Sequence, residues 1–221
     1  METQTVIKVF LVSKVSRMDI KQNLLDKAEG LFHRFGVRSI SMDEIAREVN
    51  MSKKTVYQYF KDKDEIVNLV SKQHIEREVK QFNEVFDTSE DSIDEMIKLS
   101  TCFRNTLSGM NPSLLFDLQK YHPNSWAQWL EFKNEHIKNS IKRNIERGKD
   151  EGYYRQNLDP ECLAIFRVEQ IEMTFDNSIF PQDKFNFTEV QMMLFDHFVH
   201  GLLTQRGQEI YDDLTKSNIN E

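Results

Sequence analysis

Residues 41–64, SMDEIAREVNMSKKTVYQYFKDKD, constrain the fold of this 221-residue chain more than any other segment. Ser41 and Glu44 form an S-x-x-E capping box, in which each side chain satisfies a free backbone N–H at a helix start. Ser52 can cap a second helix. Asn50, between the two helices, tolerates the left-handed conformation that a tight turn requires. The segment therefore predicts a helix-turn-helix whose second helix can enter a DNA major groove.

The second helix has two different sides. Val56 and Phe60 share the side that faces the preceding helix, because successive helical residues are rotated by about 100°. The opposite side carries amines, short hydroxyls, an amide and aromatic rings without a carboxylate, a set suited to phosphates and base edges. A solvated basic surface helix is the alternative, but the caps, the turn and the apolar side all favour DNA binding. The expected DNA-contacting residues of this helix are Ser52, Lys53, Lys54, Thr55, Tyr57, Gln58 and Tyr59.

Residues 20–70 closely resemble the DNA-binding domain of TetR-family transcriptional regulators. The family features appear in order as A-x-x-L-F-x-x-x-G at residues 28–36, I-A at residues 45–46 and S-K-x-T-x-Y-x-Y-F at residues 52–60. The resemblance implies a regulator that binds a palindromic operator in double-stranded DNA, and repression is the family's common mode. Lys54 stands where many members have glycine, so the operator sequence cannot be taken from a relative.

Two further DNA contacts are implied by the resemblance. Ser41 and Lys63 lie at the starts of two helices and should touch the DNA backbone, where free N–H groups and a partial positive charge favour phosphate. Asp62 and Glu65 repeat the capping-box spacing at the second of these helix starts.

The charge distribution agrees with DNA binding by the N-terminal part only. The formal net charge is -7, but the first 70 residues hold 12 basic and 10 acidic residues, against 17 and 26 in the remainder. DNA binding would therefore depend on a local basic face. With only 7 Gly and 4 Pro, the chain is expected to be all-α. We expect an N-terminal extension (1–18), a three-helix helix-turn-helix DNA-binding domain (19–65) and a C-terminal helical ligand-binding and dimerisation domain (66–221).

Residues 1–18 allow two interpretations. They include a short apolar, β-prone stretch that is too short to span a membrane and lacks the cleavage site of a signal peptide. One interpretation is that Met18, where the family's first helix usually begins, is the natural start. The other is an N-terminal arm in which Lys8, Lys14 and Arg17 add contacts to the DNA backbone.

The C-terminal part reads as helices separated by polar caps. The final two long helices are apolar on most sides, which predicts a second covered surface beyond their own core. In TetR-like proteins these two helices pair with their copies, so we expect a homodimer; a large monomeric core is the alternative. The expected helices are 63–86, 92–108, a short one from 112, 123–147 closed by Gly148, 160–175, and one capped by Thr188 that ends near Gly207, followed by a frayed tail after Leu214.

The aromatic and methionine side chains of the middle helices could enclose an apolar effector site. We expect a repressor released by a small, largely hydrophobic ligand, although any one of these residues could equally be core. The alternative is a DNA-binding regulator controlled by a protein partner, which a closed second domain without a cavity would favour. The candidate lining residues are Phe103, Leu107, Met110, Phe116, Tyr121, Trp126, Trp129 and Phe166, with Glu169 and Gln170 as polar groups.

An enzyme is not expected. The sequence has no G-x-x-x-x-G-K, H-E-x-x-H or G-x-S-x-G motif, so no catalytic residues, metal site or cofactor are predicted. Cys102 and Cys162 are expected to be reduced core thiols rather than a disulfide. These features are typical of a cytoplasmic bacterial regulator without a membrane partner.

Overall fold

The computed structural model describes the backbone of residues 2–219 and the side chains of residues 17–216. Within this range the chain is helical, and the sole β-type pairing is an isolated bridge between Tyr154 and Leu203. The elements are α1 (Glu2–Phe35), α2 (Met42–Glu48), α3 (Lys53–Val56), α4 (Lys63–Thr88), α5 (Ser92–Leu107), α6 (Leu114–Tyr121), α7 (Pro123–Glu131), the π-helical segment η1 (Phe132–Ile137), α8 (Lys138–Asp150), α9 (Pro160–Met173), α10 (Phe187–Leu202) and α11 (Gln205–Ile219).

The predicted helix-turn-helix is confirmed by its caps. The Ser41 hydroxyl accepts from the Glu44 N–H at 3.2 Å, and the Glu44 carboxylate accepts from the Ser41 N–H at 2.6 Å, which completes the capping box. The Ser52 hydroxyl accepts from the Thr55 N–H at 3.1 Å and starts α3. Asn50 has a φ of 55°, the left-handed conformation expected for the turn.

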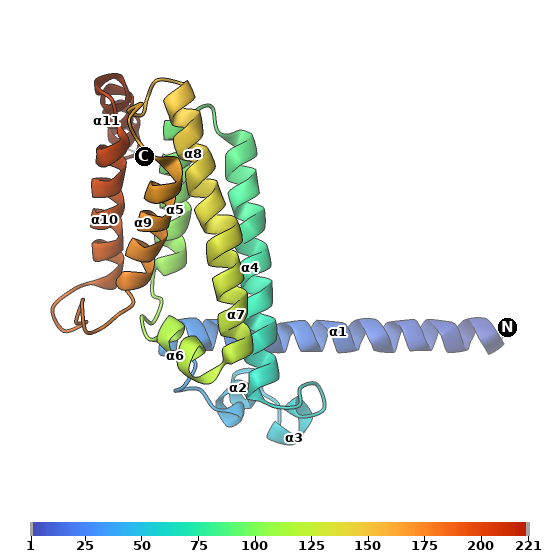
Figure 1. Ribbon diagram of the computed structural model, residues 1–221. Coiled ribbons are helices and arrows are strands. Elements are labelled where there is room, and N and C mark those ends of the chain that lie inside the picture. Colours follow the sequence, from blue (N-terminus) through green and yellow to red (C-terminus); the bar gives the residue numbers. More distant parts are fainter. Residues whose placement is uncertain (1, 220–221) are drawn as a thin grey trace.

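Helices α1 to α4 share an apolar core that holds the DNA-reading end together. Val56 and Phe60 are buried, as predicted, and pack with Ile45 of α2 and Leu24 of α1. This core continues into the C-terminal half through buried residues of α6, including Leu118. In Figure 1, α2 and α3 lie at one end of the molecule, and α4 leads from them to the C-terminal helices.

Helix α1 runs without a break across residue 18, where the sequence suggested that an extension ends. Its N-terminal part extends away from the rest of the molecule on the side of α3 and α4 (Figure 1). The apolar stretch that looked β-prone is therefore helical along its backbone.

The long helix after Pro123 is built from α7, η1 and α8 and ends at Asp150, so the expected end at Gly148 was wrong. Gly148 lies inside α8, and a glycine is needed there because a Cβ would overlap the ring of the fully buried Tyr154. The chain instead leaves the helix through Gly152, which has a φ of +77°.

The expected last helix is two helices. Asn186, and not Thr188, caps α10, since its side chain accepts from the Glu189 N–H at 3.1 Å. Helix α10 ends at Leu202 because Leu203 enters the bridge with Tyr154, and α11 then continues to Ile219 where a frayed tail was expected. No described helix is long and apolar enough to cross a membrane.

Candidate DNA interface and ligand cavity

The predicted DNA-contacting residues lie together on and after α3, which has only four residues and continues as turns through Tyr59. Lys54, Tyr57 and Gln58 are exposed, and their side chains have no hydrogen-bond partner among the described side chains. They are therefore free to meet a DNA groove. Thr55 is half-buried, and its hydroxyl lies 2.8 Å from that of Ser52.

Two of the predicted cations are engaged within the protein. The Lys53 ammonium lies 3.1 Å from the Asp43 carboxylate of α2, and both side chains are about half exposed. The Lys63 ammonium donates to the Val37 carbonyl at 2.6 Å and so ties the start of α4 to the turn after α1. Burial lowers the pKa of Lys63 despite nearby carboxylates. The implied backbone contact of Lys63 would require this hydrogen bond to be shared or broken.

Arg17 adds a group to this surface that the sequence treated only as part of an arm. Its guanidinium donates to the Gln58 carbonyl at 3.3 Å and lies 5.7 Å from the centre of the Tyr59 ring. These contacts place a cation of α1 directly beside the residues of the recognition helix.

A cavity of about 130 Å³ lies where α1 and α4 meet the C-terminal helices. Four of the predicted ligand-contacting residues line it: Phe103, Leu107, Met110 and Trp129. Five others, namely Phe116, Trp126, Phe166, Glu169 and Gln170, line a separate open groove of about 920 Å³ between α6, α7 and α9. Tyr121 lines neither space, and its exposed ring lies 5.6 Å from the Arg38 guanidinium.

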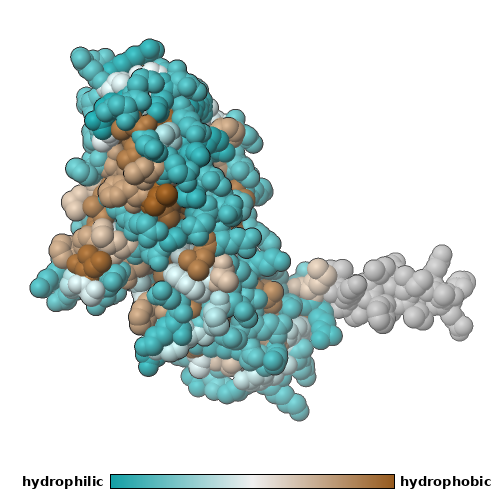
Figure 2. All heavy atoms as spheres, viewed as in Figure 1, coloured by the Kyte–Doolittle hydropathy of each residue, from teal (hydrophilic) through white to brown (hydrophobic). Residues whose placement is uncertain are grey.

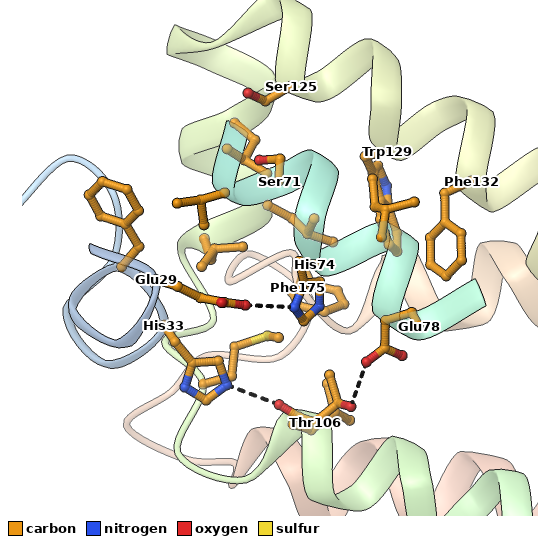
Figure 3. A pocket seen from close by; sticks show the side chains of 18 of the residues that line it. Glu29, His33, Ser71, His74, Glu78, Thr106, Ser125, Trp129, Phe132 and Phe175 are labelled. Atoms are coloured by element: carbon orange, nitrogen blue, oxygen red, sulfur yellow. Dashed lines mark hydrogen bonds and ion pairs between the residues drawn. The ribbon is translucent and has the colours of Figure 1, made fainter. Parts of the chain in front are cut away.

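The cavity has a polar edge that the sequence reasoning missed (Figure 3). Glu29 of α1 accepts from His74 of α4 at 3.1 Å and also pairs with Arg77. His33 lies 3.0 Å from the Thr106 carbonyl, and the Thr106 hydroxyl donates to Glu78 at 3.1 Å. The i, i+4 spacing of His74 and Glu78 beside apolar positions of α4 was the available signal.

The charge state of Glu29 follows from its surroundings. Burial alone would raise the pKa of this carboxyl, but the hydrogen bond from His74 and the positive charge of Arg77 outweigh burial and lower it. The wall formed by α1 and α4 therefore carries an ion pair next to a mainly apolar space.

The two polar candidates of the groove are already partnered. Glu169 lies 3.0 Å from the ammonium of Lys133, a buried residue of η1 that also pairs with Glu172. Gln170 accepts from the buried guanidinium of Arg167 at 2.9 Å. Among the described residues, no group of three or more His, Cys, Asp or Glu side chains is placed to hold a metal ion.

Helices α9 and α10 carry large exposed apolar side chains. Phe166 is 54% exposed and Met193 is 60% exposed, and Ile165 and Met173 lie on the same elements. Figure 2 shows apolar residues gathered over this side of the molecule. Cys162 is exposed on α9, so the expectation of a core thiol was wrong for this residue, whereas Cys102 is half-buried.

The structure thus combines a capped helix-turn-helix with a larger helical domain that contains a cavity, which is the organisation of a one-component DNA-binding regulator. Residues 24–70, the part of the chain that holds the helix-turn-helix, match the family model of bacterial regulatory proteins, tetR family. This match and the curated relatives, which are transcriptional regulators, support a DNA-binding transcriptional regulator rather than an enzyme.

Known proteins resemble the chain to different extents. The HTH-type transcriptional regulator YvaF of Bacillus subtilis (strain 168) is 24% identical over 166 residues, or 74% of this chain and 86% of YvaF. The nicotine-responsive repressor HdnoR of Paenarthrobacter nicotinovorans is 33% identical over 78 residues, or 35% of this chain and 40% of HdnoR. A regulator from Saccharomonospora viridis, solved in complex with choline, has a TM-score of 0.69 and 15% identity over 85% of this chain and all of that chain.

Proposed function

We propose that this protein is a homodimeric repressor that binds a palindromic operator and is released by a small, largely hydrophobic ligand. In this proposal residues 19–65 read DNA, and residues 66–221 hold the ligand and the dimer contacts. The N-terminal extension, residues 1–18, would accompany the DNA-reading part, in line with the contacts of Arg17 to Gln58 and Tyr59.

The observation that carries the ligand part of the proposal is the position of the cavity. Its wall includes Phe32 of α1 and Val67 and Val70 of α4, which are also members of the core that holds α2 and α3. A ligand in this space packs against both α1 and α4, so a shift of either helix changes the contacts of the ligand. The ligand would therefore bind two arrangements of the DNA-reading helices with different affinity, which is what release requires.

The relatives support a ligand-controlled regulator. HdnoR is described as responsive to nicotine, and the Saccharomonospora viridis regulator was solved with choline. A closed domain without a cavity would favour the alternative, which is control by a protein partner. The apolar cavity favours the ligand.

Dimerisation is supported by the exposed apolar residues on α9 and α10, because a monomer would leave Phe166 and Met193 in water. A two-fold dimer would present two α3 helices to one operator, with half-sites about one helical turn apart or slightly further. The oligomeric state at micromolar concentration, measured by sedimentation, tests this part directly. A monomer that binds its operator with full affinity would contradict it.

Base reading would fall to Lys54 of α3 and to Gln58, which lies just after this helix. Lys54→Ala and Gln58→Ala should change the preferred operator sequence, whereas Lys63→Ala should weaken binding to all sequences similarly. Sequencing of bound fragments for each variant separates the two effects. Equal losses on specific and random DNA for all three variants would contradict this division of roles.

The whole proposal is tested by retaining genome fragments on the purified protein at moderate salt and sequencing them. Enrichment of a few short palindromes, followed by their release when small apolar compounds are added, is the expected result. If palindromes are enriched but are released only by a protein from the same cells, the partner alternative holds. If no sequence is preferred, specific DNA reading by the isolated protein is refuted.

A further inference from the structure

We infer that the cavity selects a small organic cation, with its positive charge facing Glu78 and its apolar part against the surrounding aromatic rings. This inference rests on the proposed function in one respect, namely that the cavity is the effector site. It adds the chemical class of the occupant.

Glu78 is the carboxylate of the cavity wall that lacks a cation. The ion pairs of the described residues give Glu29 two basic partners, His74 and Arg77, but give Glu78 none. The side chain of Glu78 is half-buried and receives one hydrogen bond, from the Thr106 hydroxyl. A partly buried carboxylate without a counter-charge is unfavourable, so a cationic ligand beside it would recover part of its desolvation cost.

Aromatic rings of α4, α5, α7 and η1 line the same cavity as this carboxylate. Phe82 follows Glu78 by one turn on α4, and Phe103 precedes Thr106 by one turn on α5. On the long helix formed by α7, η1 and α8, the ring of Phe132 lies 5.9 Å from that of Phe82 and 6.0 Å from that of Trp129. Figure 3 shows Trp129, Phe132 and Glu78 on the same side of the cavity. Aromatic faces attract cations, most strongly where water is excluded.

The indole N–H of Trp129 is a second unsatisfied group. It is buried and has no hydrogen-bond partner, although Trp129 lines the cavity. The Nε1 atom is enclosed by protein atoms, so the ring of Trp129, and not its N–H, forms this part of the cavity wall. Glu29, His33 and His74 of the cavity wall have polar partners, whereas Glu78 has no cation among the described residues.

The volume limits the size of the cation. The space of about 130 Å³ is close to the engineered apolar cavity of about 150 Å³ that binds benzene. The occupant that fits without movement of the walls has on the order of six heavy atoms. A compact alkylammonium or quaternary ammonium group meets this limit, whereas a long acyl chain does not.

Tetramethylammonium and tert-butanol form a suitable pair of probes, because they have similar size and differ in charge. Binding to the full-length protein can be followed by calorimetry and by tryptophan fluorescence, to which Trp126 and Trp129 both contribute. Glu78→Gln removes the charge but keeps an oxygen that can accept from Thr106. Glu76→Gln is the matched control, because Glu76 is exposed on the same helix and pairs only with Lys72, at 4.0 Å.

We expect the wild-type protein to bind tetramethylammonium at least about tenfold more tightly than tert-butanol. Glu78→Gln should weaken tetramethylammonium binding by about tenfold and leave tert-butanol unchanged. Glu76→Gln should change neither. Thermal unfolding of each variant confirms that the comparison is made between folded proteins.

Equal affinity for the two probes, no binding of tetramethylammonium, or an unchanged affinity in Glu78→Gln would each overturn the inference. The outcome for the proposed function is separate. Release of the operator by a neutral apolar compound would preserve ligand control while refuting the cation. Glu78-dependent binding of tetramethylammonium without any effect of any cavity ligand on operator affinity would support the cation site and refute release.

Discussion

The ion pair between Lys53 and Asp43 holds a cation of the recognition helix on the protein instead of on DNA. The two charged groups are 3.1 Å apart, and both side chains are about half exposed. Asp43 also places a negative charge beside Ser41, at the end of the molecule that is expected to meet phosphate. Asp43→Asn should free the Lys53 ammonium for one additional phosphate contact in each subunit.

The size of the effect follows from counterion release. One additional phosphate contact steepens the dependence of log K on log salt by about 0.9. Between 1 M and 0.1 M salt, a change of about 0.9 in the slope corresponds to a gain of about eightfold in DNA affinity for each subunit that makes the contact. The gain should appear on random DNA as well as on the operator, because a phosphate contact carries no sequence information.

The stability of the domain should change little. An exposed ion pair contributes about 0–1 kcal/mol, and an acidic residue in the first turn of a helix adds about 0.3–1 kcal/mol. Fluorescence anisotropy with labelled random DNA, between about 50 and 200 mM salt, measures the slope of log K against log salt concentration. Glu48→Gln is the matched control, because it breaks the exposed Lys27–Glu48 pair of 3.8 Å at the other end of α2. An unchanged slope for Asp43→Asn would refute the reasoning that the ion pair keeps Lys53 from phosphate.

Three further predictions concern stability. Gly148→Ala should lower the free energy of unfolding by about 3 kcal/mol or more, because the new methyl overlaps the ring of Tyr154. Gly30→Ala should raise the free energy of unfolding by about 0.5–1 kcal/mol, because the space around Gly30 is open. Urea unfolding of the two variants and the wild-type protein measures both changes. Ser41→Ala should cost about 1 kcal/mol by removing half of the capping box, measured in the same way. The pKa of Glu29 is lowered in the folded state, so its stabilisation is present above its ordinary value of 4.5 and is lost as the pH falls through the folded value. Glu29→Gln should therefore lose less stability than the wild-type protein on acidification, and parallel pH profiles would contradict this.

The features predicted correctly from the sequence are those fixed by neighbours along the chain. The caps at Ser41 and Ser52 and the left-handed turn at Asn50 depend on residues within about four positions, so their spacing is sufficient. Helix ends set by distant contacts were missed. Gly148 resembles a terminator in the sequence, but its role depends on Tyr154, and the end of α10 depends on the bridge from the same tyrosine to Leu203.

The ligand-contacting residues show the same limit. Aromatic composition pointed to the middle helices, and Phe103 and Trp129 do line the cavity. The polar residues of its wall come from α1 and α4, where Glu29 and Glu78 resemble ordinary charged residues of amphipathic helices. They are distinguished only by position, since Glu78 lies next to Thr106 and Glu29 next to His74 and Arg77, and packing between segments far apart in the sequence sets these positions.

The shared core explains why the cavity and the DNA-reading helices should be coupled. Phe32 touches the cavity and belongs to the same buried cluster as Val56 and Phe60 of the helix-turn-helix and Leu118 of α6. A close-packed interior transmits a displacement because it leaves little free volume to absorb one. By thermodynamic linkage, a ligand that lowers operator affinity by a given factor must have its own affinity lowered by the same factor when the operator is bound. If titration of a cavity ligand with and without operator gave equal affinities, a ligand that releases DNA would have to act from another site.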